Sequence, residues 1–191
     1  MAKVKILPLL LALLVAATLL AAGGCDSGAG KRAPDGLEPP GETRVVLLFF
    51  ADAKAVNSGK QGEYGFVAPV AREVAAGEDP VEAALAELIR GPRPEEGHFF
   101  GTVPSTAQIL ELQVDGAVVY IDFSHELLSD SPGGTLSGTV FMQSMIFTMT
   151  QFPGIEKVAV LVEGDPWCDG HFIWEEPLGP EDLMIGAGEA N

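Results

Sequence analysis

The segment from Gln108 to Phe123 constrains the fold of this chain more than any other, because it predicts a hairpin with a defined register. Its centre is Asp115-Gly116, a residue pair typical of a type I′ turn, in which both central residues adopt positive φ. A two-residue loop at this pair predicts these cross-strand pairs: Val114 with Ala117, Leu112 with Val119, and Leu110 with Ile121. All of these side chains are apolar and would share one face of the hairpin.

The opposite face of this predicted hairpin is largely polar. Its residues are Ile109, Glu111, Gln113, Val118, Tyr120 and Asp122. An antiparallel pair commonly packs one face on the core and leaves the other solvated. We therefore expect the apolar face to lie under helices and the polar face to meet water or a partner.

The best-marked helix in the sequence begins at Asp79. Asp79 offers an N-cap, Pro80 occupies the first helical position and Glu82 the third, which together form a capping box. Gly91-Pro92 ends the helix. Its apolar stripe, which predicts packing on a core, consists of Val81, Ala84, Leu85, Leu88 and Ile89.

The remaining segments complete an α+β pattern. Val45–Phe50 is wholly apolar, which predicts a strand buried on both faces, and a loop is expected from Asp52 to Glu63. The other expected elements are a strand at Phe66–Val74 with Pro69 at an edge or bulge, a helix over Leu136–Phe152 closed by Pro153-Gly154, a central strand at Ile155–Val162 and a last strand at Gly170–Trp174. This order predicts a single compact α+β domain, with a mixed or antiparallel sheet and two helices on one face.

The first 25 residues predict export and lipid attachment. Lys3 and Lys5 precede an apolar run from Ile6 to Ala22, and Gly23-Gly24-Cys25 follows. This pattern resembles the bacterial lipoprotein signal, in which small residues before a cysteine allow lipid transfer to its thiol and cleavage just ahead of it; Ala22 stands where that signal usually has Leu. We expect a signal peptide at 1–24, a lipidated Cys25 with a tether to residue 43, a folded domain at 44–178 and a C-terminal tail at 179–191. An uncleaved membrane anchor is the alternative, because the apolar run is long enough for either.

Charge and cysteine content limit the function classes. The chain has 11 Lys or Arg against 27 Asp or Glu, and loss of residues 1–24 would leave nine against 27, a formal charge of −18. A field of this sign repels phosphate backbones, so no nucleic-acid partner is expected. With Cys25 lipidated, Cys168 is the remaining thiol, so no intramolecular disulfide is expected and the fold must be stabilised by its core.

Asp122, Ser124 and His125 are the residue types of a hydrolase triad. A triad needs the histidine ring between the other two side chains, and residues this close in sequence point in divergent directions. The chain also lacks a G-x-S-x-G elbow here. We interpret Ser124 as the cap of the following turn, with Glu126 near its positive end, and expect no catalytic residue.

Cys168 and His171 form a C-x-x-H pair that could supply two metal ligands. A structural zinc site needs four ligands, and His98 and His125 lie in separate segments. We therefore expect neither a metal nor another cofactor, and interpret the pair as part of a turn.

Methionine and tryptophan side chains leave two interpretations open. Met142, Met145 and Met149 fall on one helical stripe, which indicates core packing, with a docking surface for a partner helix as the alternative. Trp167 and Trp174 flank the last turn, either as exposed anchors or as packing at the sheet edge.

Several segments occur together in a characteristic order: Val45–Asp52, Phe66–Val74, the helix ending Glu87–Pro92, Gly101–Pro104, the hairpin ending Val119–Ser124, Thr148–Pro153 and Val158–Gly164. This ordered set resembles the GerMN domain of the spore germination and sporulation protein GerM family, which also occurs in bacterial lipoproteins. The resemblance covers Arg44 to Leu178. Its signature residues here are Asp79, Pro80, Glu82, Gly91, Pro92, Asp115, Gly116, Asp122, Phe123, Ser124, Phe152, Pro153 and Gly164.

The resemblance implies an α/β domain similar to the ring-building motifs of envelope assemblies, on the outer side of the cytoplasmic membrane, with no catalytic residues and no cofactor. The chain departs from the family in a glycine- and lysine-containing loop at Asn57–Gly62. It also shows one copy of the domain, where some relatives have two in tandem. A lone domain is less able to form a ring by itself.

These observations together predict a non-enzymatic scaffold that the lipid on Cys25 anchors to the outer leaflet of the cytoplasmic membrane. We expect it to bind unidentified envelope proteins through a sheet edge or the polar hairpin face, with weak self-association, in sporulation or germination. One alternative is a solute-binding lipoprotein, which needs a concave apolar pocket. A less favoured alternative is an envelope hydrolase built on Ser124 and His125.

Overall fold

The computed structural model describes residues 42–183. The predicted signal peptide, Cys25 and nearly all of the predicted tether lie outside the described residues, although Thr43 already belongs to the first strand. No helix within residues 42–183 is both long enough and apolar enough to span a membrane.

The described residues form an α+β domain, as predicted. Its helices are α1 (Ala53–Ser58), α2 (Pro80–Arg90), α3 (Glu126–Ser129) and α4 (Thr135–Met149), with short 3-10 turns η1 (Pro94–Glu96) and η2 (Pro180–Asp182). Its strands are β1 (Thr43–Asp52), β2 (Val67–Ala75), β3 (Phe99–Phe100), β4 (Ile109–Asp115), β5 (Val118–Phe123), β6 (Lys157–Val162) and β7 (Asp165–Pro166).

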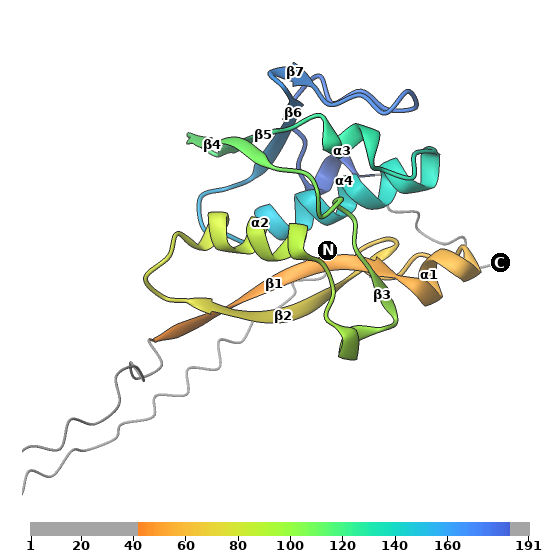
Figure 1. The fold of residues 1–191 in the computed structure, drawn as a ribbon, viewed down its shortest axis with the longest axis horizontal. Helices are drawn as coiled ribbons and strands as arrows, with labels where there is room; N and C mark the ends of the chain where they lie inside the picture. Colours follow the sequence, from red (N-terminus) through yellow and green to blue (C-terminus); the bar gives the residue numbers. More distant parts are fainter. Residues whose placement is uncertain (1–41, 184–191) are drawn as a thin grey trace, which may run out of the picture. The chain divides into compact units, whose positions relative to one another are not determined.

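The strands form two sheets, where the sequence predicted one. The first sheet has the order β2-β1-β3, and the second has the order β4-β5-β6-β7 with β5 and β6 parallel. In Figure 1, helices α2 and α4 lie between β1 and β2 on one side and β4, β5 and β6 on the other. The two sheets and two helices share one core, which includes Leu48 and Phe50 of β1, Leu85 and Leu88 of α2, Met145 and Met149 of α4, and Val119, Ile121 and Phe123 of β5.

Polar side chains on and just after helix α4 hydrogen-bond the stretch of the β1 edge that β3 leaves open. The Gln151 amide, just after α4, accepts from the Leu47 N–H at 2.7 Å and donates to the Leu47 carbonyl at 2.6 Å. Thr148 Oγ1 accepts from the Phe49 N–H at 3.1 Å, and Ser144 Oγ donates to the Phe49 carbonyl at 2.6 Å. Backbone groups at a buried strand edge need partners. The helix supplies them here, so no strand of the second sheet pairs with this stretch of β1.

The first strand is buried on both faces only in its second half. Val45 is 64% exposed and Leu47 is 39% exposed, which contradicts the predicted burial of the whole run. Phe49 and Ala51 lie on the same face as these two residues but are covered by Val140 of α4 and by neighbouring aromatic rings. The outer face of β1 is therefore open at one end and covered at the other.

The hairpin forms, but its turn is one residue further along than predicted. Asp115 pairs with Val118, so the turn residues are Gly116 and Ala117. Gly116 has φ +59°, while Ala117 is not among the residues with positive φ, a pattern typical of a type II′ turn with glycine first. From Glu111 to Asp115 each cross-strand partner is shifted by two residues, so these side chains keep their predicted faces.

A β-bulge between Ile109 and Glu111 alters the start of β4. The extra residue reverses the alternation of side chains at this point. Ile109 consequently packs against the core, and Leu110 is exposed, which is the opposite of the prediction for both.

Helix α2 follows the prediction closely. Asp79 Oδ1 accepts from the Val81 and Glu82 N–H groups at 2.9 and 3.1 Å, and Pro80 is the first helical residue. The return bond from Glu82 that completes a capping box is not formed among the described residues. The apolar stripe lies in the core as expected.

Other boundaries differ in small ways. The predicted loop after Asp52 contains α1, whose N-cap is Asp52 itself. Helix α4 ends at Met149 and not at Phe152. The predicted last strand is reduced to a single bridge between Cys168 and Ile173, whereas Asp165–Pro166 pairs with β6 as β7.

We predict that Thr148→Val lowers the free energy of unfolding by about 2 kcal/mol, because it leaves the buried Phe49 N–H without an acceptor at nearly constant volume. Thr139→Val is the matched control: the Thr139 hydroxyl donates to the Thr135 carbonyl within the same helix, so we expect a change below about 0.5 kcal/mol. Urea denaturation of both variants measures the difference. Equal losses would show that the bond to β1 has no special weight.

Candidate interaction surface

The three residue types of a triad do not form one. Asp122 Oδ1 accepts from the Gly164 N–H at 3.1 Å, and Ser124 Oγ accepts from the Gln108 N–H at 3.0 Å. His125 is exposed at the start of α3. Each side chain is directed to a different part of the fold, so this segment has no catalytic geometry.

The Ser124 side chain does not cap α3, contrary to the prediction. It accepts from Gln108 at the start of the hairpin and donates to the Glu126 carboxylate. This bond, followed by one from the backbone of Glu126, lowers the pKa of Glu126 below its ordinary value. The bonded carboxylate therefore stabilises the fold above that ordinary pKa, and the contribution is lost as the pH falls through the lowered value.

Cys168 and His171 lie at an exposed turn near the C-terminal end of the described chain. Asp169 Oδ1 orders the turn by accepting from the His171 and Phe172 N–H groups, both at 2.8 Å. Within residues 42–183, no group of three or more His, Cys, Asp or Glu side chains is placed to hold a metal ion.

The tryptophans pack in the core, so the interpretation as exposed anchors is wrong. Trp167 and Trp174 are both buried, and their rings contact each other and Phe141 of α4. Trp174 Nε1 also donates to the Val158 carbonyl of β6 at 3.0 Å. The segment after β7 is thus fixed against β6 and α4.

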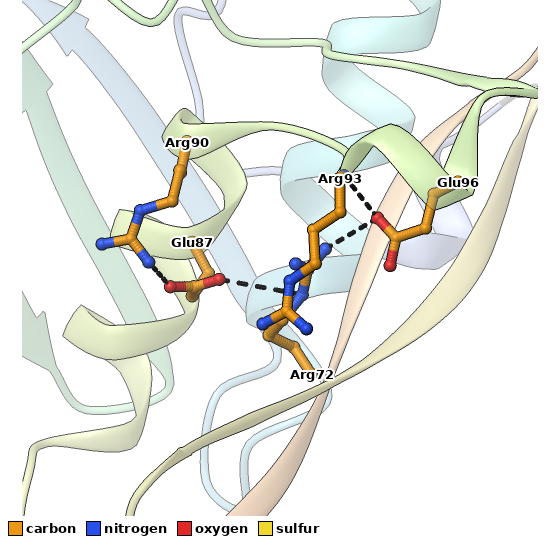
Figure 2. A network of polar contacts seen from close by, with 5 residues as sticks. All are labelled: Arg72, Glu87, Arg90, Arg93 and Glu96. Atoms are coloured by element: carbon orange, nitrogen blue, oxygen red, sulfur yellow. Dashed lines mark hydrogen bonds and ion pairs between the residues drawn. The ribbon is translucent and has the colours of Figure 1, made fainter.

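A buried arginine lies on the inner face of β2 (Figure 2). Arg72 is 1% exposed, and its Nη2 donates to Glu96 Oε2 of η1 at 2.9 Å. Its Nε lies 3.7 Å from Glu87 Oε2 of α2, and Glu87 also pairs with the exposed Arg90. The Glu96 carboxylate accepts in addition from the Arg93 N–H at 2.7 Å. This ion cluster ties the outermost strand of the first sheet to α2 and η1.

The Arg72 cluster is incompletely bonded, and sequence reasoning missed it. Nε and Nη1 of Arg72 and Oε2 of Glu87 are buried without a hydrogen-bond partner in the described structure. A signal was present: in a strand of period two, Arg72 falls on the same face as Val70 and Val74.

The outer face of the β1–β2 pair is the clearest open surface of the first sheet. We define the outer β1–β2 face by Val45, Leu47, Pro69, Ala71 and Ala75, which share one side of the pair in the observed register. All five are exposed. Clustered apolar side chains on a flat surface typically mark a site of protein interaction. The predicted edge position of Pro69 is confirmed, because β2 is an end strand of the first sheet.

A hollow of about 440 Å³ lies beside the first half of α4. Its apolar lining comes from Phe66, Met142, Phe172 and Leu183, and its polar lining from Gln61, Thr135, Thr139, Gln143 and Asp182. Met142 is half-buried here, whereas Met145 and Met149 are fully buried, so the core interpretation is confirmed for those two methionines.

Comparison with known proteins identifies the domain. The family Germane, described as "Sporulation and spore germination", matches residues 47–168, which confirms the resemblance seen in the sequence. A Clostridium perfringens protein described as a lipoprotein is 20% identical, with a TM-score of 0.51 over 78% of this chain and 95% of that one. The tandem GerMN domains of the sporulation protein GerM from Bacillus subtilis are 17% identical, with a TM-score of 0.53 over 77% of this chain and 48% of that one. At these identities the likeness establishes the fold alone. Comparison with curated proteins found no match.

We predict that Glu96→Gln lowers the free energy of unfolding by about 2 kcal/mol, since the buried Arg72 then keeps a single carboxylate at 3.7 Å. Arg90→Ala is the control, because Arg90 is exposed and pairs with the same Glu87; we expect less than about 0.5 kcal/mol. Chemical denaturation at neutral pH compares the two. A larger loss for Arg90→Ala would contradict the importance of the buried cation.

Proposed function

This chain belongs to the Germane family of sporulation and spore germination, and we propose on that basis that it is a non-enzymatic scaffold of the cell envelope, anchored by lipid. The observation that carries the proposal is the outer β1–β2 face, where apolar side chains lie exposed on a pair of strands. Partner proteins bind such surfaces by covering the apolar side chains from water. The family description supports a role in sporulation or germination.

The proposed anchor is a lipid on Cys25, which holds the domain at the outer leaflet of the cytoplasmic membrane. Support comes from the basic start, the apolar run and Gly23-Gly24 directly before the cysteine. The C. perfringens protein with a similar fold is described as a lipoprotein, which agrees with this proposal. Two acyl chains or more would make the attachment stable.

Site-specific photo-crosslinking from native membranes tests the scaffold role. A crosslinker at Ala71, on the outer β1–β2 face, should yield defined adducts with envelope proteins, identified by mass spectrometry. A crosslinker at the exposed His171, in the C-terminal turn, is the control and should yield only background. Leu47→Asp should remove the Ala71 adducts, because a carboxylate on this face resists burial. Adducts that persist in Leu47→Asp, or that are equal from both positions, would count against the proposal.

A second candidate function is the presentation of a small apolar solute, which the hollow beside α4 favours. Its volume and mainly apolar lining with a few polar groups are typical of ligand pockets. We predict that indole, used as a probe, raises the melting temperature in a concentration-dependent way and that Met142→Trp, which fills the hollow, removes the shift. Leu136→Trp, at an exposed position of the same helix, should retain it. Identical shifts in all three proteins would reject binding in this hollow.

A further inference from the structure

The second sheet ends at β4, whose main chain is open on one side. In a two-residue hairpin the residues flanking the turn exchange both hydrogen bonds, and bonded pairs then alternate along the strands. With Asp115 opposite Val118, the bonded positions of β4 are Asp115, Gln113 and Glu111. The N–H and C=O groups of Leu112 and Val114 therefore point away from β5. No further strand pairs with this edge among residues 42–183.

The helix layer covers β5 fully but stops short of β4. Val119 and Ile121 of β5 are completely buried. Val114 of β4, which pairs with Val119, is 51% exposed. Leu110, at the bulge, is 53% exposed. Figure 1 shows β4 at the border of the domain above α2. The sheet thus ends in a strand with open backbone groups and exposed apolar side chains, which is the usual template for pairing with another chain.

A groove of about 480 Å³ runs between β4 and the first turn of α2. Its apolar lining comes from Val81, Ile109, Leu110, Leu112 and Val114. Its polar lining is acidic: Asp79, Glu82 and Glu111 are all exposed, and no Lys or Arg lines the groove. The groove therefore combines an apolar floor with a negatively charged rim.

We propose that β4 receives an extended segment of a partner protein in which apolar side chains alternate with Lys or Arg. The partner's main chain would bond to Leu112 and Val114, and alternate apolar side chains would enter the groove, as in strand addition to a sheet edge. Because successive side chains of a strand point to opposite faces, the basic side chains would lie on the face of β4 away from the groove, near Glu111, and the charges of Asp79 and Glu82 at the rim would add to the attraction. This second docking site rests on the proposed scaffold role but not on the outer β1–β2 face.

The negative charge around the groove favours a different protein over a second copy of this chain as the occupant. The chain has a formal charge of −16, and pairing two β4 edges would bring together two acidic rims. Like charges placed opposite each other disfavour such a pair. A basic segment of another protein is therefore the occupant that the groove fits.

The test uses the full chain in detergent micelles and two synthetic seven-residue peptides, one alternating Val with Lys and one alternating Val with Glu. Hydrogen–deuterium exchange resolved to single amides should show at least tenfold slower exchange at Leu112 and Val114 with saturating Lys peptide. The Lys peptide should bind at least tenfold more tightly than the Glu peptide, and its affinity should fall with added salt. Equal binding of the two peptides, or unchanged exchange at these amides, would overturn the proposal.

Variants separate this site from the first surface. Val114→Pro removes an outward N–H without removing a bond to β5, so it should weaken the Lys peptide at least tenfold. Should this variant misfold, Glu82→Gln combined with Glu111→Gln should weaken the Lys peptide at least threefold at low salt and leave the fold intact. Leu47→Asp, on the outer β1–β2 face, is the matched control and should bind normally.

Three outcomes distinguish the alternatives. Slower exchange at Leu112 and Val114 on concentrating the protein without peptide would identify a second copy as occupant and overturn the proposal. Crosslinks from Ala71 without any peptide effect at β4 would overturn this inference and leave the scaffold function standing. Peptide binding at β4 without crosslinks from Ala71 would support this inference and count against the outer β1–β2 face.

Discussion

Four hydrogen bonds between β1 and the polar side chains of α4 and Gln151 determine how the rest of the domain is arranged. They satisfy the backbone of Leu47 and Phe49 without a neighbouring strand, so only the short β3 pairs with β1 on this side. The same helix packs Met145 and Met149 against the core shared with the second sheet. One helix thus closes the edge of one sheet and joins it to the other, which is why two small sheets replace a single large one.

This arrangement leaves two open strand surfaces. On the first sheet, α4 covers the outer face of β1 at Phe49 and Ala51 but not at Val45 and Leu47. On the second sheet, the helices cover β5 but not the whole of β4. Both surfaces expose apolar side chains of strands, whereas the residue types of a triad are directed to unrelated partners. Asp122, Ser124 and His125 therefore do not assemble a triad.

The buried Arg72 connects β2 to α2 and η1 through ion pairs. Its guanidinium is paired with two carboxylates from separate elements, yet two of its nitrogen atoms have no hydrogen-bond partner among the described residues. Such a cluster adds little net stability compared with an apolar core. It does require β2, α2 and η1 to keep one relative position (Figure 2), on the side of β2 opposite the outer β1–β2 face.

Local patterns in the sequence were sufficient for helix α2, for the hairpin and its two faces, and for the family resemblance, because capping residues, glycine turns and side-chain periodicity act over a few neighbouring residues. They did not predict the turn position, the bulge that exchanges Ile109 and Leu110, or the exposure of Val45 and Leu47. Those features, like the open edge of β4 and the pairing of Arg72, depend on contacts with elements that are distant in the sequence. Contacts between α4 and β1 join residues about a hundred positions apart, and no local pattern records which partner a strand edge or a buried charge will meet.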